Sequence, residues 1–102
     1  MITITAIIRA RKGCENAMRD ALLVVAEHVR QHEAQTVGFF VSQDLVDPGT
    51  FTTYERFVDE AAMDRHNASA ASTNFFAVAR DLLDGSVTLV RANELTAKDS
   101  RA

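Results

Sequence analysis

Apolar and polar residues alternate along the first stretch of the chain, from Ile2 to Ala10. One side of this stretch carries Ile2, Ile4, Ala6 and Ile8. The other side is mostly threonine and arginine, with Ile7 as the apolar exception. A period of two with many β-branched residues predicts a β-strand. Gly13 predicts the break after it.

The spacing changes between Glu15 and Glu33, where apolar residues recur every three or four positions. The apolar stripe consists of Met18, Leu22, Val25 and Val29. This period predicts an amphipathic helix of about 18–20 residues with one buried face.

Two stretches rich in Phe, Val and Thr follow, from Thr36 to Val46 and from Thr50 to Val58. Their composition is typical of strands. The turn sequence Asp47-Pro48-Gly49 separates them, so we expect a β-hairpin.

The next helix is predicted to start at Glu60, with Asp59 as its N-cap, and to end near His66 or Ala68. The small polar residues from Asn67 to Ser72 predict a joint.

A second helical run carries Phe75, Val78, Ala79, Leu82 and Leu83 at three-and-four spacing. We expect Ser72 or Thr73 to cap it and Gly85 to stop it. Val87 to Leu95 has the composition of a final strand.

This order of elements predicts an α+β fold of the ferredoxin-like, split βαββαβ type. It has a four-stranded antiparallel sheet with helices on one face. The uncovered face would carry Ile7, Tyr54 and Val90. Because exposed apolar patches usually mark interfaces, we expect a homodimer through the sheet, a dimeric α+β barrel.

The length of 102 residues predicts one domain, assigned to residues 1–96, followed by a polar, flexible tail at 97–102. The net charge of −3 and the lack of a dense basic cluster argue against nucleic acid as a partner. No apolar run is long enough for a membrane span, so a cytoplasmic protein is expected. A single cysteine, Cys14, excludes an internal disulfide.

The candidate chemistry lies between Tyr54 and His66. Glu55 falls on the strand face that also carries Phe51, Thr53 and Phe57, while Met63 and His66 share one face of the following helix. If that helix packs on that strand face, an acid and a base meet in an apolar layer. The pair suits proton transfer, although a buried hydrogen bond between helix and sheet is the structural alternative.

The predicted apolar walls of a ligand pocket are Phe39, Phe51, Phe57, Met63, Phe75 and Phe76, with Thr53 and Asn74 as polar members. Asn67 is expected to face away from the pocket. His28, at the margin of the apolar stripe of its helix, is expected to face into the cavity between helix and sheet and to contact the substrate.

His28 and His32 are four residues apart, but no third ligand is spaced to join them, so no metal site is predicted. No glycine-rich phosphate loop is present, so no cofactor is predicted either.

The chain resembles the antibiotic biosynthesis monooxygenase family. The resemblance covers Ile2 to about Leu95. It rests on the Ile2–Ala10 strand with Lys12-Gly13, on Asp44-Leu45-Val46-Asp47-Pro48-Gly49, and above all on the stretch from Tyr54 to His66. The chain departs from the family in having Phe57 where Trp is common, in lacking Trp altogether, and in placing Asn74 before Phe75 where a Pro-His pair is frequent. The absence of Trp argues against the haem-degrading branch.

The resemblance implies a cofactor-independent monooxygenase that acts on a small aromatic of the quinol, phenol or anthrone type with O₂. His66 would be the base and Glu55 would orient it. Two alternatives stay open. One is an isomerase of a small keto compound, for which a phosphorylated substrate would need Arg9, Arg11 or Arg91. The other is a non-enzymatic dimeric module that binds small molecules or serves in stress response.

Overall fold

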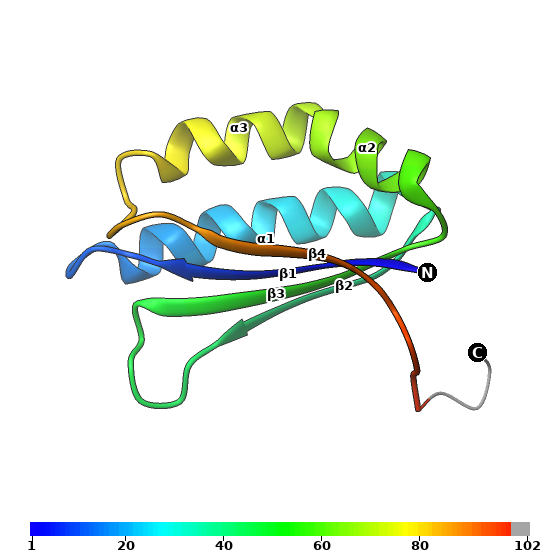
Figure 1. Cartoon of the computed structure of the whole chain (residues 1–102). Helices are drawn as coiled ribbons and strands as arrows, with labels where there is room; N and C mark the ends of the chain where they lie inside the picture. Colours follow the sequence, from blue (N-terminus) through cyan, green and yellow to red (C-terminus); the bar gives the residue numbers. More distant parts are fainter. Residues whose placement is uncertain (99–102) are drawn as a thin grey trace.

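A computed structural model describes residues 1–98 of the chain (Figure 1). The elements are β1 (Ile2–Arg9), α1 (Glu15–His32), β2 (Thr36–Gln43), β3 (Thr50–Phe57), α2 (Glu60–Ala68), α3 (Ala70–Ala79) and β4 (Thr88–Asn93). The strands form one antiparallel sheet in the order β2-β3-β1-β4. This is the predicted α+β, ferredoxin-like fold. Of the predicted tail, residues 99–102 lie outside the described residues.

All three helices lie on one face of the sheet, as expected from the sequence pattern (Figure 1). The predicted stripe of α1 is the buried side of that helix. It packs on the inward residues of β1 and β3, in a core that includes Ala6, Ile8, Leu22, Val25 and Phe51. A second, smaller core cluster joins Ile4 and Phe57 to Ala62 and Met63 of α2. The alternation of β1 therefore sets which residues meet the helices.

The register of the sheet places the polar residues of β3 beside small or branched residues of β1. Glu55 pairs with Ile4, and Thr53 pairs with Ala6. Both polar residues therefore point toward the helices. This is the arrangement that brings an acid into the layer between sheet and helices.

The hairpin is confirmed, but β2 ends at Gln43 and not at Val46. The carboxylate of Asp44 accepts hydrogen bonds from the backbone N–H groups of Val46 and Asp47, which turns the chain out of the sheet. Leu45 and Val46 are consequently 101% and 90% exposed. Their apolar character suggested strand, and the local side-chain bonds of Asp44 override it.

The joint between α2 and α3 is a single residue, Ser69, in extended conformation. Ser69 caps α3 by accepting a hydrogen bond from the Ser72 N–H, so the prediction of Ser72 or Thr73 as the cap is wrong. Ser72 is instead buried inside α3, and its hydroxyl donates to the carbonyl of His66 at 2.8 Å. This bond fixes the angle between the two helices. Helix α3 ends at Ala79, before the predicted stop at Gly85.

The outer face of the sheet carries no helix within residues 1–98. Phe40, Tyr54 and Val90 on this face are 57%, 39% and 53% exposed. Glu94 and Arg56 form an ion pair beside them, with 2.7 Å between Arg56 Nη2 and Glu94 Oε1. The Tyr54 hydroxyl donates to the same carboxylate. No helix in the described part of the chain is long and apolar enough to cross a membrane.

Candidate active site

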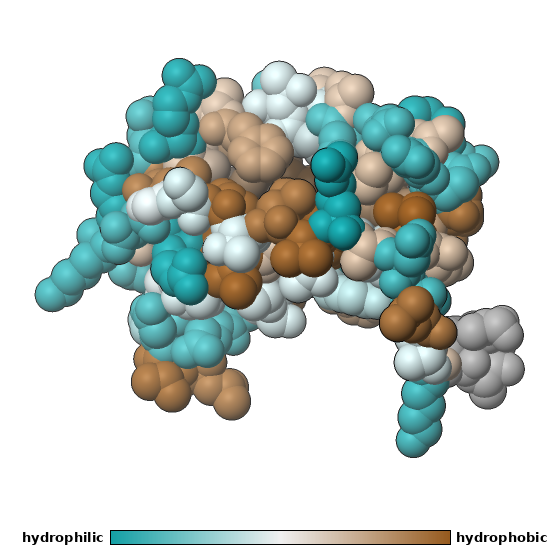
Figure 2. All heavy atoms as spheres, viewed as in Figure 1, coloured by the Kyte–Doolittle hydropathy of each residue, from teal (hydrophilic) through white to brown (hydrophobic). Residues whose placement is uncertain are grey.

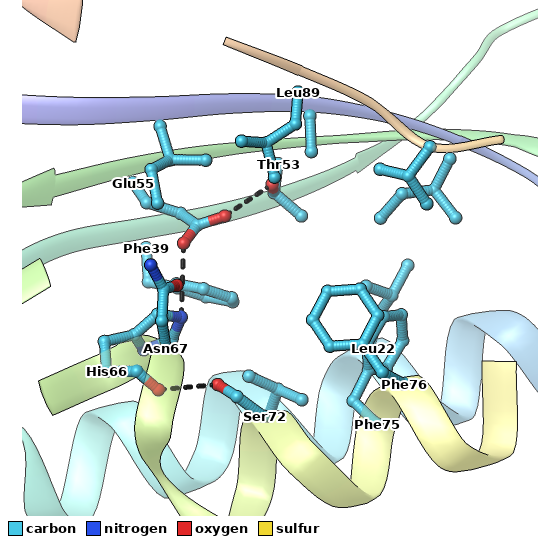
Figure 3. Close-up of a pocket in the computed structure, with 15 residues that line it drawn as sticks. Leu22, Phe39, Thr53, Glu55, His66, Asn67, Ser72, Phe75, Phe76 and Leu89 are labelled. Carbon is cyan, nitrogen blue, oxygen red and sulfur yellow. Dashed lines mark hydrogen bonds and ion pairs between the residues drawn. The ribbon is translucent and has the colours of Figure 1, made fainter. Parts of the chain in front are cut away.

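A cavity of about 60 Å³ lies between the helices and the inner face of the sheet (Figure 3). Its apolar walls include Ile4, Ala6, Ile8, Leu22, Val25, Phe39, Phe75, Phe76, Val87 and Leu89. Its polar lining consists of Thr53, Glu55, His66, Asn67 and Ser72. An apolar pocket with a few convergent polar groups is the usual form of a small-molecule site. Apolar residues also gather on the surface between the helices and β4 (Figure 2).

The acid and the base predicted from the sequence meet in this cavity. His66 Nε2 lies 3.2 Å from Glu55 Oε1, and the two residues are only 5% and 7% exposed. The Thr53 hydroxyl donates to the other oxygen of Glu55 at 2.7 Å. The aromatic rings of Phe39 and Phe57 flank the imidazole, with centroids 5.5 Å and 5.3 Å away. The imidazole is therefore held in place by both polar and apolar contacts.

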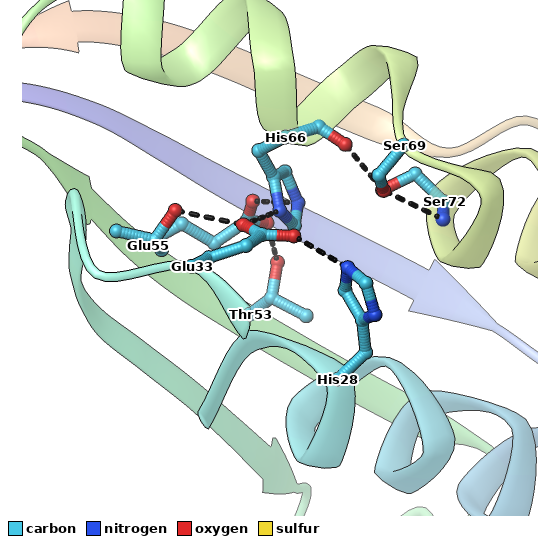
Figure 4. Close-up of polar contacts among 8 residues, drawn as sticks. His28, Glu33, Thr53, Glu55, His66, Ser69 and Ser72 are labelled. Carbon is cyan, nitrogen blue, oxygen red and sulfur yellow. Dashed lines mark hydrogen bonds and ion pairs between the residues drawn. The ribbon is translucent and has the colours of Figure 1, made fainter. Parts of the chain in front are cut away.

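A second carboxylate, Glu33, holds the opposite side of the imidazole (Figure 4). Glu33 Oε1 lies 2.8 Å from His66 Nδ1 and also accepts a hydrogen bond from the Thr36 hydroxyl. Glu33 is the C-terminal cap residue of α1. The residue is positioned by the end of a helix, far from Glu55 in the sequence, so the pattern around Tyr54–His66 carried no sign of it.

Two competing effects set the charge of His66. Burial is the largest single influence and disfavours the charged ring, but the hydrogen bonds and charges of Glu55 and Glu33 together outweigh it. The pKa of His66 is therefore raised above its ordinary value of 6.5. The imidazolium form donates one N–H to each carboxylate, which satisfies both ring nitrogens.

His28 is the last member of this polar group. Its Nε2 lies 3.2 Å from Glu33 Oε2, and its side chain is 30% exposed. It lines a separate, open cleft on the far side of Glu33 and does not line the apolar cavity. The expectation that His28 faces into the ligand cavity is therefore wrong. Within residues 1–98, no cluster of three or more His, Cys, Asp or Glu side chains is arranged to hold a metal ion.

Comparisons with known proteins bear on the family and the fold of the chain. The family model described as antibiotic biosynthesis monooxygenase matches residues 1–78. The chain belongs to this family. No curated protein matches the chain.

The solved structures that resemble this monooxygenase-family chain cover nearly its whole length. A crystal structure of an antibiotic biosynthesis monooxygenase is 21% identical, has a TM-score of 0.86, and covers 94% of this chain and 100% of its own. A Pseudomonas aeruginosa protein is 26% identical, with a TM-score of 0.84 and coverage of 93% and 94%. A Shewanella oneidensis protein is 27% identical, with a TM-score of 0.83 and coverage of 89% and 87%. At this identity the common feature is the fold.

Most of the other predicted pocket residues of this family member fall into two groups. Phe39, Thr53, Phe75 and Phe76 line the cavity as expected. Phe51, Phe57 and Met63 are buried core residues outside its lining.

The predictions for Asn67 and Asn74 are both wrong. Asn74 is exposed and lines a shallow apolar groove between α1 and α3, so it does not reach the cavity. Asn67, expected to face away, lines the cavity beside His66 (Figure 3). The break at Ser69 separates α3 from α2, so the helical phase of Asn74 does not continue from that of His66.

Proposed function

We propose that this protein is a cofactor-independent monooxygenase that acts on a small aromatic of the quinol, phenol or anthrone type. The observation that carries the proposal is the buried Glu55–His66 pair on the polar side of an otherwise apolar cavity. A hydroxyl group on a flat apolar ring can bury the ring against the phenylalanines and present its proton to the pair.

The first step is removal of that proton. The sequence suggested His66 as the base and Glu55 as its orienter, but both ring nitrogens of His66 already face carboxylates. We therefore assign the first proton-accepting atom to a carboxylate oxygen of Glu55. His66 supports this step because its raised pKa favours the positive charge that the ring takes up as the substrate becomes an anion.

The second step is oxidation of the substrate anion by O₂. A quinolate or the enolate of an anthrone is electron-rich enough to transfer electrons to O₂ directly. One oxygen atom enters the ring carbon, the other leaves as water, and the organic substrate is the only reductant consumed. The amide of Asn67, which lines the cavity, can donate a hydrogen bond to the oxyanion.

The size of the cavity restricts the substrate. Its volume of about 60 Å³ is below the roughly 150 Å³ that accommodates a benzene ring. Entry of one ring therefore requires movement of side chains at the open side, where Phe76 is 52% exposed and Leu89 is 48% exposed. We expect single-ring substrates to be preferred over fused polycyclic ones.

We infer that two copies pair through the outer faces of their sheets. Phe40, Tyr54 and Val90 are each more than a third exposed on this face, although the sequence places them in regular strands. A second copy of the same sheet would cover them with a self-complementary surface.

Oxygen uptake by the purified protein tests the proposed activity. The substrates are single-ring quinols, naphthols and anthrones, and the variants are E55Q and H66Q, with E60Q as a matched control because Glu60 is exposed in the first turn of α2. We expect uptake by the wild type and E60Q, and a loss of about 10²-fold or more in E55Q and H66Q.

The other outcomes separate the alternatives. Conversion of a keto substrate without oxygen uptake would identify an isomerase. Saturable binding of an aromatic by a folded protein that consumes none of the substrates would identify a binding module.

A further inference from the structure

A continuous line of polar side chains runs from the cavity to a second opening in the surface (Figure 4). It begins at Glu55 and passes through His66 and Glu33 to His28, with gaps of 3.2, 2.8 and 3.2 Å between the facing atoms. Each member can both accept and release a proton.

The second opening is a cleft between the C-terminal end of α1 and the side of α2. Its polar lining includes His28, His32, Glu33, Arg65 and Ser69. His66 lines both this cleft and the cavity, so its ring forms the partition between them.

At the outer end of the line, Glu33 and His28 are placed so that a proton can pass between them. Glu33 Oε2 is fully buried and receives no hydrogen bond from any described residue, and His28 Nε2 is 3.2 Å away from it. A buried carboxylate oxygen without a donor is costly, so such an atom requires an explanation. A small rotation of the half-buried His28 ring would align the contact.

We propose that Glu55, His66, Glu33 and His28 form a proton relay, through which the proton taken from a substrate in the cavity leaves to water in the second cleft. The proposal rests on the proposed function for the origin of the proton. Glu33 and His28 are positioning and relay residues, since they do not touch the cavity.

The transfer balances as follows. The transfer starts from the neutral His66 ring, which carries its proton on Nδ1 and has a free Nε2 facing Glu55. The substrate O–H proton binds to Glu55, the Glu55 proton passes to His66 Nε2, and the proton on His66 Nδ1 passes to Glu33. Glu33 gives a proton to a free Nε2 of His28, whose Nδ1–H proton goes to water, and exchange with water restores the starting tautomers. One proton enters, one leaves, and every member returns to its first charge.

Two further ionisable side chains lie at the outer end of the relay. Arg65 and His32 line the cleft at its outer end, and the Arg65 guanidinium is bonded to the Gln35 side chain. Within residues 1–98, the ionisable side chain that faces His66 from the sheet is Glu55. Glu33, the cap residue of α1, faces the other side of the ring, and His28 of α1 lies against Glu33.

The test that needs no substrate is the exchange of the His66 ring N–H protons with water, measured by nitrogen-15 NMR. H28F keeps a ring in place but removes the proton carrier, whereas H28A leaves a space that free imidazole can fill. H32F is the matched control, because His32 lies in the same cleft with its ring 5.2 Å from that of His28.

We expect exchange of the Nδ1 proton to slow at least about tenfold in H28F and to stay unchanged in H32F. Added imidazole should accelerate exchange in H28A and have little effect in H28F. Wild-type exchange in H28F, or equal acceleration by imidazole in both variants, would overturn the relay.

Turnover supplies the second readout. If the protein oxidises a quinol, H28A should lower kcat with KM unchanged, and imidazole should restore kcat. If no quinol is oxidised, the proposed function fails, and the NMR result still decides whether the relay exists. Wild-type kcat in H28A during active turnover would contradict the relay and leave the oxygenase intact.

Discussion

Replacement of His66 by glutamine should change stability in a pH-dependent way. The imidazolium bridges two carboxylates in a layer where all three side chains are at most 13% exposed. Removing one partner of such a buried group costs about 3–5 kcal/mol, because it leaves buried charge uncompensated. The glutamine amide can still donate to one carboxylate, so we expect a loss near the lower end of this range for H66Q.

The sign of the pH dependence follows from the raised pKa of His66. A group whose pKa is higher in the folded than in the unfolded state stabilises the fold fully below the unfolded value and loses this effect as pH rises through the folded value. Each unit by which the pKa is raised contributes about 1.4 kcal/mol. The difference between wild type and H66Q should thus be largest just below the ordinary value of 6.5 and should shrink in alkaline solution.

Urea unfolding followed by circular dichroism measures this difference at a series of pH values. H32Q is the control, because His32 is exposed at the end of α1 and should give a small difference that does not vary in the same way. A wild-type advantage over H66Q that is constant with pH, or that grows in alkaline solution, would refute the assignment of His66 as a cation held between Glu55 and Glu33.

Three further predictions concern the cavity opening, the outer face of the sheet and its ion pair. F76A should raise kcat/KM for two-ring relative to one-ring quinols in steady-state assays and should alter stability by less than about 1 kcal/mol, because Phe76 is 52% exposed. V90E should convert a species of twice the 11.2 kDa chain mass into a single chain in sedimentation experiments, whereas a wild-type protein of 11.2 kDa would exclude the dimer. E94Q should lower the pKa of Tyr54, since the hydrogen bond to Glu94 raises that pKa above 10.0. Absorbance titration of Tyr54, the sole tyrosine, measures this pKa, and an unchanged titration curve would contradict the contact. In the same variant the melting temperature should fall at neutral pH but not in acid, because Arg56 lowers the pKa of Glu94 and its stabilising effect is lost as the carboxylate becomes protonated.

The fold was predictable because its periodic patterns were long. Apolar and polar residues alternate throughout Ile2–Arg9, and the apolar stripe from Met18 to Val29 extends over several helical turns. The buried face of each element was therefore clear from the spacing alone. The element ends were less predictable, because side-chain bonds such as those of Asp44 and Ser69 decide them. These bonds compete with the apolar pattern at single residues, where periodicity carries no information.

The polar contacts of the site were predictable only where the partners lie close together in the sequence. Glu55 and His66 flank one turn, so strand and helix periodicity brought them together. Glu33 reaches the same imidazole from the end of α1, a contact that depends on how α1 packs across the sheet. Asn74 was misplaced because the helix breaks at one residue, Ser69, which periodicity does not reveal.

The most direct test of the central claim is the absorbance spectrum of a chromogenic phenol bound in the cavity, recorded at a pH where the free phenol is mostly protonated. We predict that wild-type protein binds it as the phenolate, and that E55Q binds it as the neutral phenol. A neutral phenol in both proteins would contradict the assignment of Glu55 and His66 as the groups that remove the substrate's proton.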